Sequence, residues 1–239
     1  MNEKISAADV DRANLDKNPS EVAGMFNKVA KRYDATNAAL SFGTVWYWRH
    51  ELVKTLAPKA GQKVLDLAAG TGRSTASLAK TGADVVGADL SEGMLDVARK
   101  TYPNLKFVQA NATNLPFEDN AFDAATISFG LRNIVDTRAA LKEMARVVRP
   151  GGRLLVCEFS HPQNKVFSAA YSTYNRYVLP RIARLVSSDD VAYDYLTESI
   201  TDWPDQESLK RTIGECGWRN VKYRNLTFGI VAFHTALAR

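Results

Sequence analysis

Apolar residues recur along the chain at two different spacings, and the spacing predicts where helices and strands lie. From Glu21 to about Tyr33 they recur every three or four positions, as on one face of an amphipathic helix. The stretch Thr44–Leu56 also reads as a helix, which ends before Pro58. Residues 1–20 are polar and mixed in charge, so we expect a flexible N-terminal arm there.

Beyond residue 57 the pattern changes to short apolar runs that alternate with helical segments. The runs predict five strands: Lys63–Ala68, Ala83–Ala88, Leu105–Gln109, Ala121–Ser128 and Arg153–Glu158. The segments between them predict helices near Thr75–Lys80, Glu92–Thr101 and Asp136–Val148, the last stopped by Pro150-Gly151-Gly152. Such strand–helix alternation is typical of a doubly wound parallel sheet.

The C-terminal part completes this sheet. Residues 162–216 look mostly helical, and Trp218–Leu226 and Gly229–Ala238 predict a closing hairpin around Thr227-Phe228-Gly229. We therefore predict an α/β, Rossmann-like fold: a doubly wound, mostly parallel seven-stranded sheet with N-terminal helices and a helical insertion before the last two strands. It forms one domain over 21–239, in which 21–57 is a helical lid and 162–203 a helical cap.

Composition narrows the class of protein. The 239 residues are 46% hydrophobic and 24% charged, as in ordinary globular domains. No signal peptide is visible, and no apolar run approaches the roughly 20 residues that span a bilayer. Two cysteines, Cys157 and Cys216, exclude a disulfide scaffold and favour the cytoplasm. The net charge of +5 is mild and lacks a Lys/Arg block, so no nucleic-acid partner is expected.

The stretch VLDLAAGTGRST, residues 64–75, breaks a buried strand with two glycines. Gly70 and Gly72 let the backbone turn and come close to a ligand that a Cβ would exclude. A helix that opens after them presents unpaired N–H groups. The stretch therefore predicts a binding site, with Thr71 between the glycines as part of it.

Two ligands and one structural alternative compete for this turn. A dinucleotide fingerprint needs a third glycine where Thr75 stands, and no Gly-Lys-Ser/Thr of a Walker loop follows. S-adenosylmethionine needs an acidic residue at the end of the first strand for its amino-acid end, and a carboxylate after the second strand for the ribose. Asp66 and Asp89 occupy these positions. Asp89 alone also suits NAD, and a structural turn with solvated aspartates is the remaining alternative; the pairing with Asp66 favours S-adenosylmethionine.

Further candidates follow the third and fourth strands. Asn111-Ala112 forms a turn that could hold an adenine, beside the apolar Leu115-Pro116-Phe117. Ser128 ends the fourth strand, at the carboxyl edge where open α/β sheets bind ligands. These three positions extend the predicted cofactor site.

At this point the chain resembles the class I methyltransferases and, more closely, the ubiquinone/menaquinone biosynthesis C-methyltransferase family. The resemblance runs from about Val22 to the C-terminus. It rests on MFNKVAKRYDATNAALSFG, VLDLAAGTG, ISFGLRN, VRPGGRLLVCEFS, YLTESITDWPDQ and NLTFGIVAFH. Ala68 departs from the pattern, because many methyltransferases have the first glycine of the loop there.

The resemblance implies that S-adenosylmethionine donates a methyl group to a ring carbon of a polyprenylated demethylquinol. Conversion of demethylmenaquinol to menaquinol is favoured; the benzoquinol of the ubiquinone pathway and a soluble phenol stay open. A non-catalytic protein that binds the cofactor and scaffolds a quinone-synthesis complex is the alternative from another class. No metal is required, and His50, His161 and His234 show no ligand spacing.

Four residues are candidates for the chemistry. Arg132 and Asn133 follow the fourth strand and are expected to face the quinol, where the guanidinium would stabilise a phenolate; a surface ion pair is the alternative. Tyr33 is expected to fold over the cofactor as part of the lid, or else to belong to the core. His234, inside an apolar strand, is a candidate proton acceptor or a structural histidine.

Residues 163–185 contain no acidic residue, and their basic residues are interleaved with aromatic and aliphatic ones. This composition predicts weak, reversible contact with a membrane surface, which would place a cytoplasmic protein at the inner face of the cell membrane beside its lipid quinol. A helical cap over the substrate pocket or a partner subunit is the alternative. The sequence leaves a homo-oligomer open.

Overall fold

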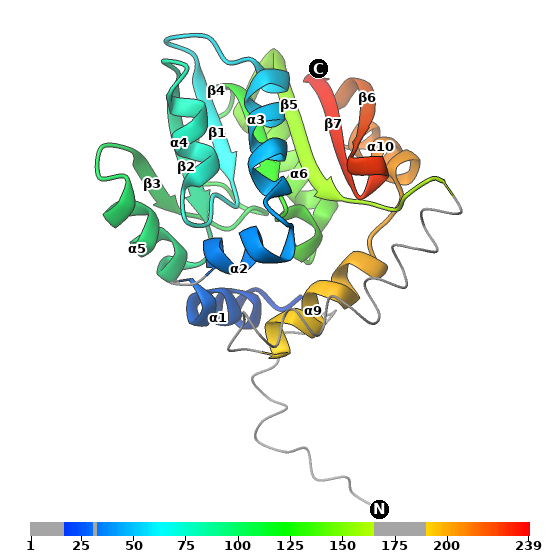
Figure 1. Cartoon of the computed structure of the whole chain (residues 1–239). Coiled ribbons are helices and arrows are strands. Elements are labelled where there is room, and N and C mark those ends of the chain that lie inside the picture. Colours follow the sequence, from blue (N-terminus) through cyan, green and yellow to red (C-terminus); the bar gives the residue numbers. More distant parts are fainter. Residues whose placement is uncertain (1–16, 31–32, 165–189) are drawn as a thin grey trace, which may run out of the picture.

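A seven-stranded sheet in the order β3-β2-β1-β4-β5-β7-β6 runs through the molecule (Figure 1). The computed structural model describes residues 17–30, 33–164 and 190–239. The strands are β1 (Lys63–Leu67), β2 (Asp84–Asp89), β3 (Lys106–Gln109), β4 (Phe122–Ser128), β5 (Val148–Phe159), β6 (Trp218–Leu226) and β7 (Val231–Ala238). Strands β1 to β5 pair in parallel, whereas β7 runs antiparallel to both β5 and β6. The predicted mostly parallel sheet with a closing hairpin is confirmed.

Helices cover both faces of this sheet and its carboxyl edge. They are α1 (Pro19–Val29), α2 (Tyr33–Leu40), α3 (Thr44–Leu56), α4 (Arg73–Ala79), α5 (Glu92–Thr101), α6 (Thr137–Val147), α9 (Asp190–Thr201) and α10 (Gln206–Glu215). Short 3₁₀ turns lie at Leu131–Asn133 and Thr227–Gly229. The predicted bounds of α3 and α5 are confirmed to the residue.

The N-terminal helical region differs from the prediction. The segment expected to be one helix up to Tyr33 is two helices, since α1 ends at Val29 and Tyr33 begins α2. Helical apolar spacing runs on from Val29 to Tyr33, four positions later, so periodicity alone could not show the break. Helix α1 also starts at Pro19, inside the expected flexible arm, where the Asn18 side chain caps it by accepting from the Ser20 N–H at 3.1 Å. Residues 1–16 of that arm lie outside the described residues.

The start of β5 is a second difference. Pro150-Gly151-Gly152 was expected to be a loop before the strand, but β5 begins at Val148 and runs through it. The pairing of β5 with β4 shifts register between Phe122 and Ala124, and Gly151 has a φ of 75°. The glycines therefore form an irregularity within the strand, as in a β-bulge.

Each face of the sheet buries its own apolar layer. On one face α3 and α4 pack against the strands, chiefly through Trp48, Leu52, Leu56 and Leu78 over Val64, Val85, Ala124 and Leu155. On the other face α6 and α10 do the same, through Leu141, Met144, Val147, Leu209 and Ile213 over Leu65, Val86, Ile127 and Val156. Burial on both faces explains why these strands read as continuous apolar runs.

Helices α1, α2 and α9 lie across the carboxyl edge of the parallel strands (Figure 1). The loops that follow β1, β2 and β4 are therefore enclosed between the sheet and these helices. Within the described ranges, no helix is long and apolar enough to cross a membrane. The architecture directs attention to the enclosed edge as the place where a ligand binds.

The Trp218 indole tests how the outer strands are attached. Its side chain is buried, and Nε1–H donates to the carbonyl of Leu141 in α6 at 3.0 Å. We expect Trp218→Phe to lower the free energy of unfolding by about 1–3 kcal/mol, because it removes both the donor and part of a core ring. Trp46→Phe, at an exposed position on α3, should stay within about 0.5 kcal/mol. If chemical denaturation showed the same loss of unfolding free energy for Trp218→Phe and Trp46→Phe, the Trp218 side chain would not be what attaches the outer strands.

Candidate active site

The glycine loop between β1 and α4 is built from left-handed residues. Ala68 has a φ of 54°, Gly70 of 55° and Gly72 of 81°. Alanine rarely adopts this conformation. Its methyl group fits because Gly130, after β4, has no side chain: a Cβ on Gly130 would overlap the Cβ of Ala68. The alanine at the position where many methyltransferases have a glycine is thus accommodated by a glycine in the loop after the neighbouring strand β4.

Asp89 ends β2 and holds this loop in place. Its Oδ2 accepts from the Gly70 N–H and its Oδ1 from the Ser91 N–H, both at 2.8 Å. Burial raises the pKa of the Asp89 carboxyl, and the backbone N–H groups counteract this by stabilising the charged form. Each carboxylate oxygen keeps a further lone pair for a ligand. The structure thus brings together the glycine loop and the carboxylate that the sequence analysis paired.

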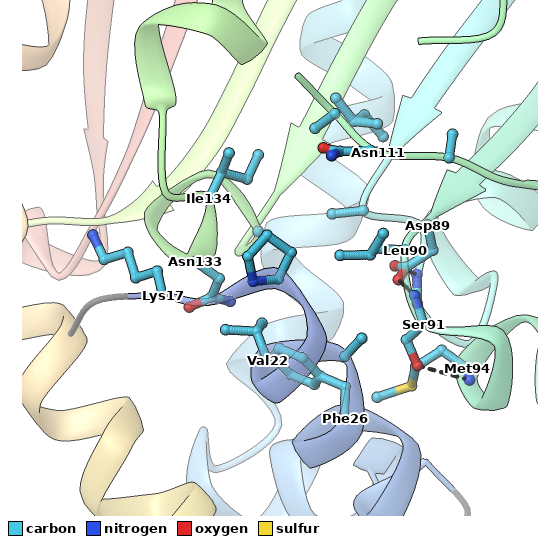
Figure 2. A pocket seen from close by; sticks show the side chains of 18 of the residues that line it. Lys17, Val22, Phe26, Asp89, Leu90, Ser91, Met94, Asn111, Asn133 and Ile134 are labelled. Atoms are coloured by element: carbon cyan, nitrogen blue, oxygen red, sulfur yellow. Dashed lines mark hydrogen bonds between the residues drawn. The ribbon is translucent and has the colours of Figure 1, made fainter. Parts of the chain in front are cut away.

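A first cavity opens beside Asp89 (Figure 2). It encloses about 840 Å³ of empty space, open solvent at its mouth included. Leu90, Asn111 and Ala112 line it next to Asp89, and Val22 and Phe26 of α1 reach it from the lid. The Asn111 Oδ1 accepts from the Thr113 N–H at 3.0 Å, which fixes the turn. The expected adenine-side residues therefore share one cavity with Asp89.

A second cavity of about 1040 Å³, again including open solvent, lies on the side of α2 and α3. Apolar and aromatic side chains line it together with the loop and two arginines: Val45, Trp48, Leu52, Phe129, Thr71, Arg49 and Arg73. The two cavities share Tyr33, Ala68, Gly70, Ser128 and Phe129. The Oγ of Ser128 is buried and has no hydrogen-bond partner within the described part of the chain. One elongated ligand could therefore cross from one cavity to the other past Gly70 and Ser128.

Asp66 lies beneath the loop and lines neither cavity. The residue is 1% exposed, its Oδ2 accepts from the Thr75 hydroxyl at 2.7 Å, and burial raises the pKa of its carboxyl to about 7. The Asp66 Oδ1 is buried without a hydrogen-bond partner among the described residues, and its contact with the amino-acid end of a cofactor stays a prediction. Thr75, which stands where a dinucleotide site has its third glycine, instead ties the first turn of α4 to β1.

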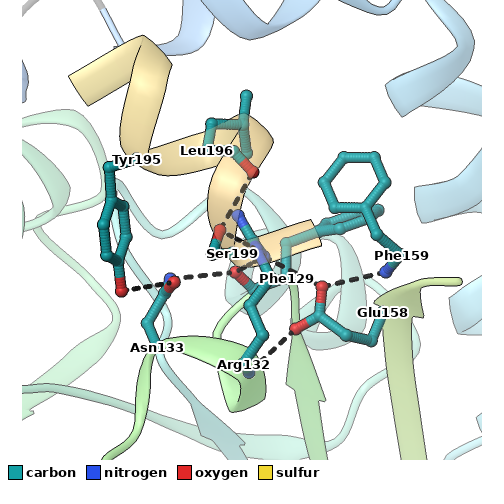
Figure 3. Close-up of polar contacts among 8 residues, drawn as sticks. All are labelled: Phe129, Arg132, Asn133, Glu158, Phe159, Tyr195, Leu196 and Ser199. Carbon is teal, nitrogen blue, oxygen red and sulfur yellow. Dashed lines mark hydrogen bonds and ion pairs between the residues drawn. The ribbon is translucent and has the colours of Figure 1, made fainter. Parts of the chain in front are cut away.

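Arg132 is buried and makes polar contacts with residues of several elements (Figure 3). Its side chain is 5% exposed, and its Nη1 lies 2.9 Å from Oε1 of Glu158, whose side chain is 1% exposed. The Arg132 N–H also donates to Glu158 Oε2 at 3.3 Å. Arg132 lines neither of the two cavities, and its contact with a quinol stays a prediction. In this structure Arg132 binds the end of β5.

The pair fixes the conformation of Phe129, which forms part of both cavities. Phe129 has a φ of 55°, strained for a bulky residue, and its carbonyl accepts from Arg132 Nη1 at 2.5 Å. Its N–H donates to the carbonyl of Cys157 at 2.8 Å. The Phe129 ring packs on Trp48 and Phe159, with ring centroids 5.5 and 4.9 Å apart. Arg132 therefore acts on the cavity through Phe129.

Asn133 and Tyr33 both reach the cavities. Asn133 lines the first cavity, and its Oδ1 accepts from the Tyr195 hydroxyl of α9 at 3.2 Å (Figure 3). Tyr33 lines both cavities, and burial raises the pKa of its phenol. Its neighbour Asp34 accepts from the Thr71 hydroxyl at 3.0 Å and pairs with Arg73 at 2.7 Å. Helix α2 is thus fastened to the glycine loop, and its role as a lid stays a prediction.

His234 is not brought to this site. It is buried on β7, opposite Val156 of β5 and Tyr223 of β6. Its Nε2 lies 2.8 Å from the carbonyl of Gln206, and burial lowers the pKa of the ring. It lines neither of the two cavities. These contacts are those of a structural histidine, the alternative that the sequence left open.

The sequence analysis missed Arg49, which lines the second cavity. The signal was present: Arg49 stands three residues before Leu52 and seven before Leu56, on the face of the predicted helix that carries its apolar residues. A cation at such a position points to an internal partner.

Within the described residues, no cluster of His, Cys, Asp or Glu could hold a metal ion. The segment 165–185, expected to touch a membrane, lies outside them.

Comparisons with known proteins identify the family of this chain. The model of the ubiE/COQ5 methyltransferase family matches residues 14–238. A demethylmenaquinone methyltransferase of Corynebacterium kroppenstedtii is 57% identical over 225 residues, 94% of this chain and 97% of the relative. That of Mycolicibacterium paratuberculosis is 58% identical over 226 residues, again 94% of this chain and 97% of the relative.

Solved structures show the same fold at low identity. An S-adenosylmethionine-dependent methyltransferase of Thermotoga maritima matches with a TM-score of 0.67 at 18% identity, over 91% of this chain and all of the other. Phosphoethanolamine N-methyltransferase 2 of Haemonchus contortus, in complex with S-adenosyl-L-methionine, gives 0.60 at 18% identity, over 81% of this chain and 52% of the other. The predicted class I methyltransferase fold is confirmed. Because the family model and both relatives match nearly the whole chain, the protein belongs to the ubiE/COQ5 methyltransferase family.

Proposed function

We propose that this protein transfers a methyl group from S-adenosylmethionine to a ring carbon of demethylmenaquinol, which gives menaquinol. The observation that carries the proposal is the pair of connected cavities, one beside Asp89 and one lined by aromatic side chains, in a chain 57% identical to a demethylmenaquinone methyltransferase. The first cavity suits a nucleoside, and the aromatic walls suit a flat apolar ring.

The residues present fit the methyl donor. Asp89 would accept from the ribose hydroxyls, and Asn111-Ala112 would border the adenine. Gly70, Thr71 and Ser128 would lie along the rest of the molecule, where the buried Ser128 Oγ has no partner within the described residues. When bound, S-adenosylmethionine supplies an electrophilic methyl group on a positively charged sulfur. Asp66 supports the loop from below through Thr75.

The remaining catalysis is orientation in a dry site. A quinol carbon becomes nucleophilic when the adjacent hydroxyl loses its proton, and phenolate and sulfonium charges then cancel during transfer. A site that excludes water favours a step in which charge disappears. Phe129 and Tyr33 lie where the two cavities meet, and they would orient the ring beside the methyl donor. Arg132 is a positioning residue that holds Phe129, and Asn133 is the polar candidate at the wall.

The direct test is a methylation assay with purified protein. We expect demethylmenaquinol with a polyprenyl tail to gain one methyl group, detected by mass spectrometry, when S-adenosylmethionine is present. Asp89→Ala should weaken donor binding by about 1–3 kcal/mol, because it removes charge-assisted hydrogen bonds.

Calorimetry provides the binding control for this assay. Ser77→Ala, on the exposed side of α4, should leave the affinity unchanged. Binding of NAD without binding of S-adenosylmethionine would overturn the cofactor assignment. Faster methylation of a benzoquinol, or of a soluble phenol with no dependence on tail length, would overturn the substrate assignment.

The Arg132–Glu158 pair gives a second prediction. Loss of one partner of a buried pair costs about 3–5 kcal/mol, so Arg132→Ala should destabilise the fold by that order. It should also lower kcat at saturating donor more than it lowers affinity for S-adenosylhomocysteine, because Asp89 and Gly70 are untouched. Arg132→Lys keeps the positive charge but lacks the planar guanidinium. It should therefore recover only part of the lost stability and only part of the lost kcat. Denaturation, steady-state kinetics and calorimetry measure these effects.

The matched control is Arg138→Ala, which removes an exposed arginine paired with Glu215 on the surface. It should leave the free energy of unfolding nearly unchanged, because an exposed ion pair is screened by solvent. Arg132→Ala with unchanged stability and unchanged kcat would show that Arg132 positions nothing.

We also propose that residues 163–185 bring the protein to the lipid that carries its substrate, on the cytoplasmic side of the cell membrane. The support is the sequence alone: four basic residues among aromatic ones, with no acidic residue. Each basic residue near an anionic leaflet contributes on the order of 1 kcal/mol. We expect sedimentation with anionic vesicles that weakens as salt rises and is lost on replacement of Arg176, Arg181 and Arg184 by Gln. Vesicle binding that changes neither with salt nor with the three replacements would contradict the proposal.

A further inference from the structure

Arg49 is a cation that lines the second cavity. Its side chain is half-buried in the second cavity, between α3 and the glycine loop. Within the residues that the structure describes, it makes no hydrogen bond or ion pair. The other two arginines of this region are paired, Arg73 with Asp34 at 2.7 Å and Arg132 with Glu158 at 2.9 Å. Within that part of the chain, the Arg49 guanidinium is therefore available to an anion that a ligand in this cavity would supply.

The charges around Arg49 leave the second cavity positive. Arg73 repels it, whereas Asp34 and Asp66 attract it. Asp34 is already engaged by Arg73 and the Thr71 hydroxyl. Asp66 is buried under the loop, bonded to Thr75, with the pKa of its carboxyl raised to about 7. Arg49 and Arg73 thus share one surface carboxylate, that of Asp34, which is already paired. The remaining positive charge favours binding of an anionic ligand group in this cavity.

We propose that Arg49 binds the carboxylate at the amino-acid end of the methyl donor. The inference rests on the proposed function and follows from the order of groups in that molecule: adenine, ribose, sulfur, amino acid. A ribose on Asp89 occupies the first cavity, and Gly70 lines both cavities. The part of the molecule beyond the sulfur must therefore pass Gly70 into the second cavity, where Thr71 and Arg49 lie. A guanidinium can bind a carboxylate through two parallel hydrogen bonds.

The contact would also couple the donor to the lid. Arg49 belongs to α3, and α2 and α3 form the wall of the second cavity opposite the loop. A carboxylate held between Arg49 and the glycine loop would join this wall to the sheet, in addition to the Asp34–Arg73 pair. The alternative anion is the oxygen of a deprotonated quinol, and the experiment separates the two.

The experiment compares two ligands that differ only in the carboxylate: S-adenosylhomocysteine and its decarboxylated analogue. Titration calorimetry measures both with the full-length protein and with Arg49→Gln. We expect Arg49→Gln to weaken S-adenosylhomocysteine about 10- to 100-fold, the size of a lost charge-assisted contact, and to leave the analogue unchanged. The affinity of Arg49→Lys for S-adenosylhomocysteine should lie between those of the wild-type protein and Arg49→Gln. Lys54→Gln, which removes an exposed cation from the same helix, should change neither affinity.

Each other outcome overturns the proposal. Equal weakening of both ligands would mean that Arg49 shapes the cavity without binding the carboxylate. Unchanged S-adenosylhomocysteine affinity with a lower kcat/KM for the quinol would assign Arg49 to the quinol oxygen. Failure of the proposed function is distinguishable, because a wild-type protein that discriminates between the two ligands but does not methylate demethylmenaquinol would leave the Arg49 contact standing.

Discussion

The buried ion pair between Arg132 and Glu158 holds together the part of the structure where a substrate would meet a cofactor. Removing these two charges from water costs several kcal/mol, and the pair recovers that cost only through close geometry and additional hydrogen bonds. Those bonds are present: Glu158 Oε1 accepts from the Phe159 N–H at 2.9 Å, and Arg132 donates to the carbonyl of Phe129. The pair therefore keeps Phe129 in a strained conformation that no helix or strand would impose, and so defines the wall that both cavities share.

The lid is fastened to the same loops that would hold the cofactor. On α1, Asn27 accepts from the Ser91 hydroxyl at 2.7 Å and from the Gly93 N–H at 2.8 Å, directly after Asp89. On α2, Asp34 contacts Thr71 and Arg73 of the glycine loop. The same loops thus carry the expected cofactor contacts and the polar contacts to α1 and α2, so the two helices and the loops form one polar network.

The sheet and the cofactor edge were predictable from sequence because they depend on local patterns. Buried parallel strands read as apolar runs. Asp89 directly follows such a run, so its position at the carboxyl end of a strand could be predicted. The role of Arg132 was not predictable, because its partner is 26 residues away and is brought near only by the register that sets Ser128 opposite Cys157. The surroundings of His234 were not predictable for a related reason: its bond to the Gln206 carbonyl joins two elements that are separate in the sequence, so the pattern alone left a proton acceptor and a structural histidine open. Arg49 needed no tertiary information, only attention to a cation on an apolar helical face.

The choice of ligand is decided by which positions near the loop lack a side chain and which carry one. Gly72 has no room for a Cβ, which would come within 2.7 Å of the Phe107 ring, whereas a Cβ on Gly70 would meet only open space. Gly72 is therefore required by packing, and Gly70 by the left-handed turn and by access to the cavities. Position 68 tolerates a methyl group because Gly130 yields the space, and position 75 carries a hydroxyl because the buried Asp66 needs a donor. A pyrophosphate site would place its third glycine where Thr75 stands. The loop is instead built for close approach at one point, Gly70, which suits a ligand that passes over it with a sulfur and an amino acid in place of phosphates.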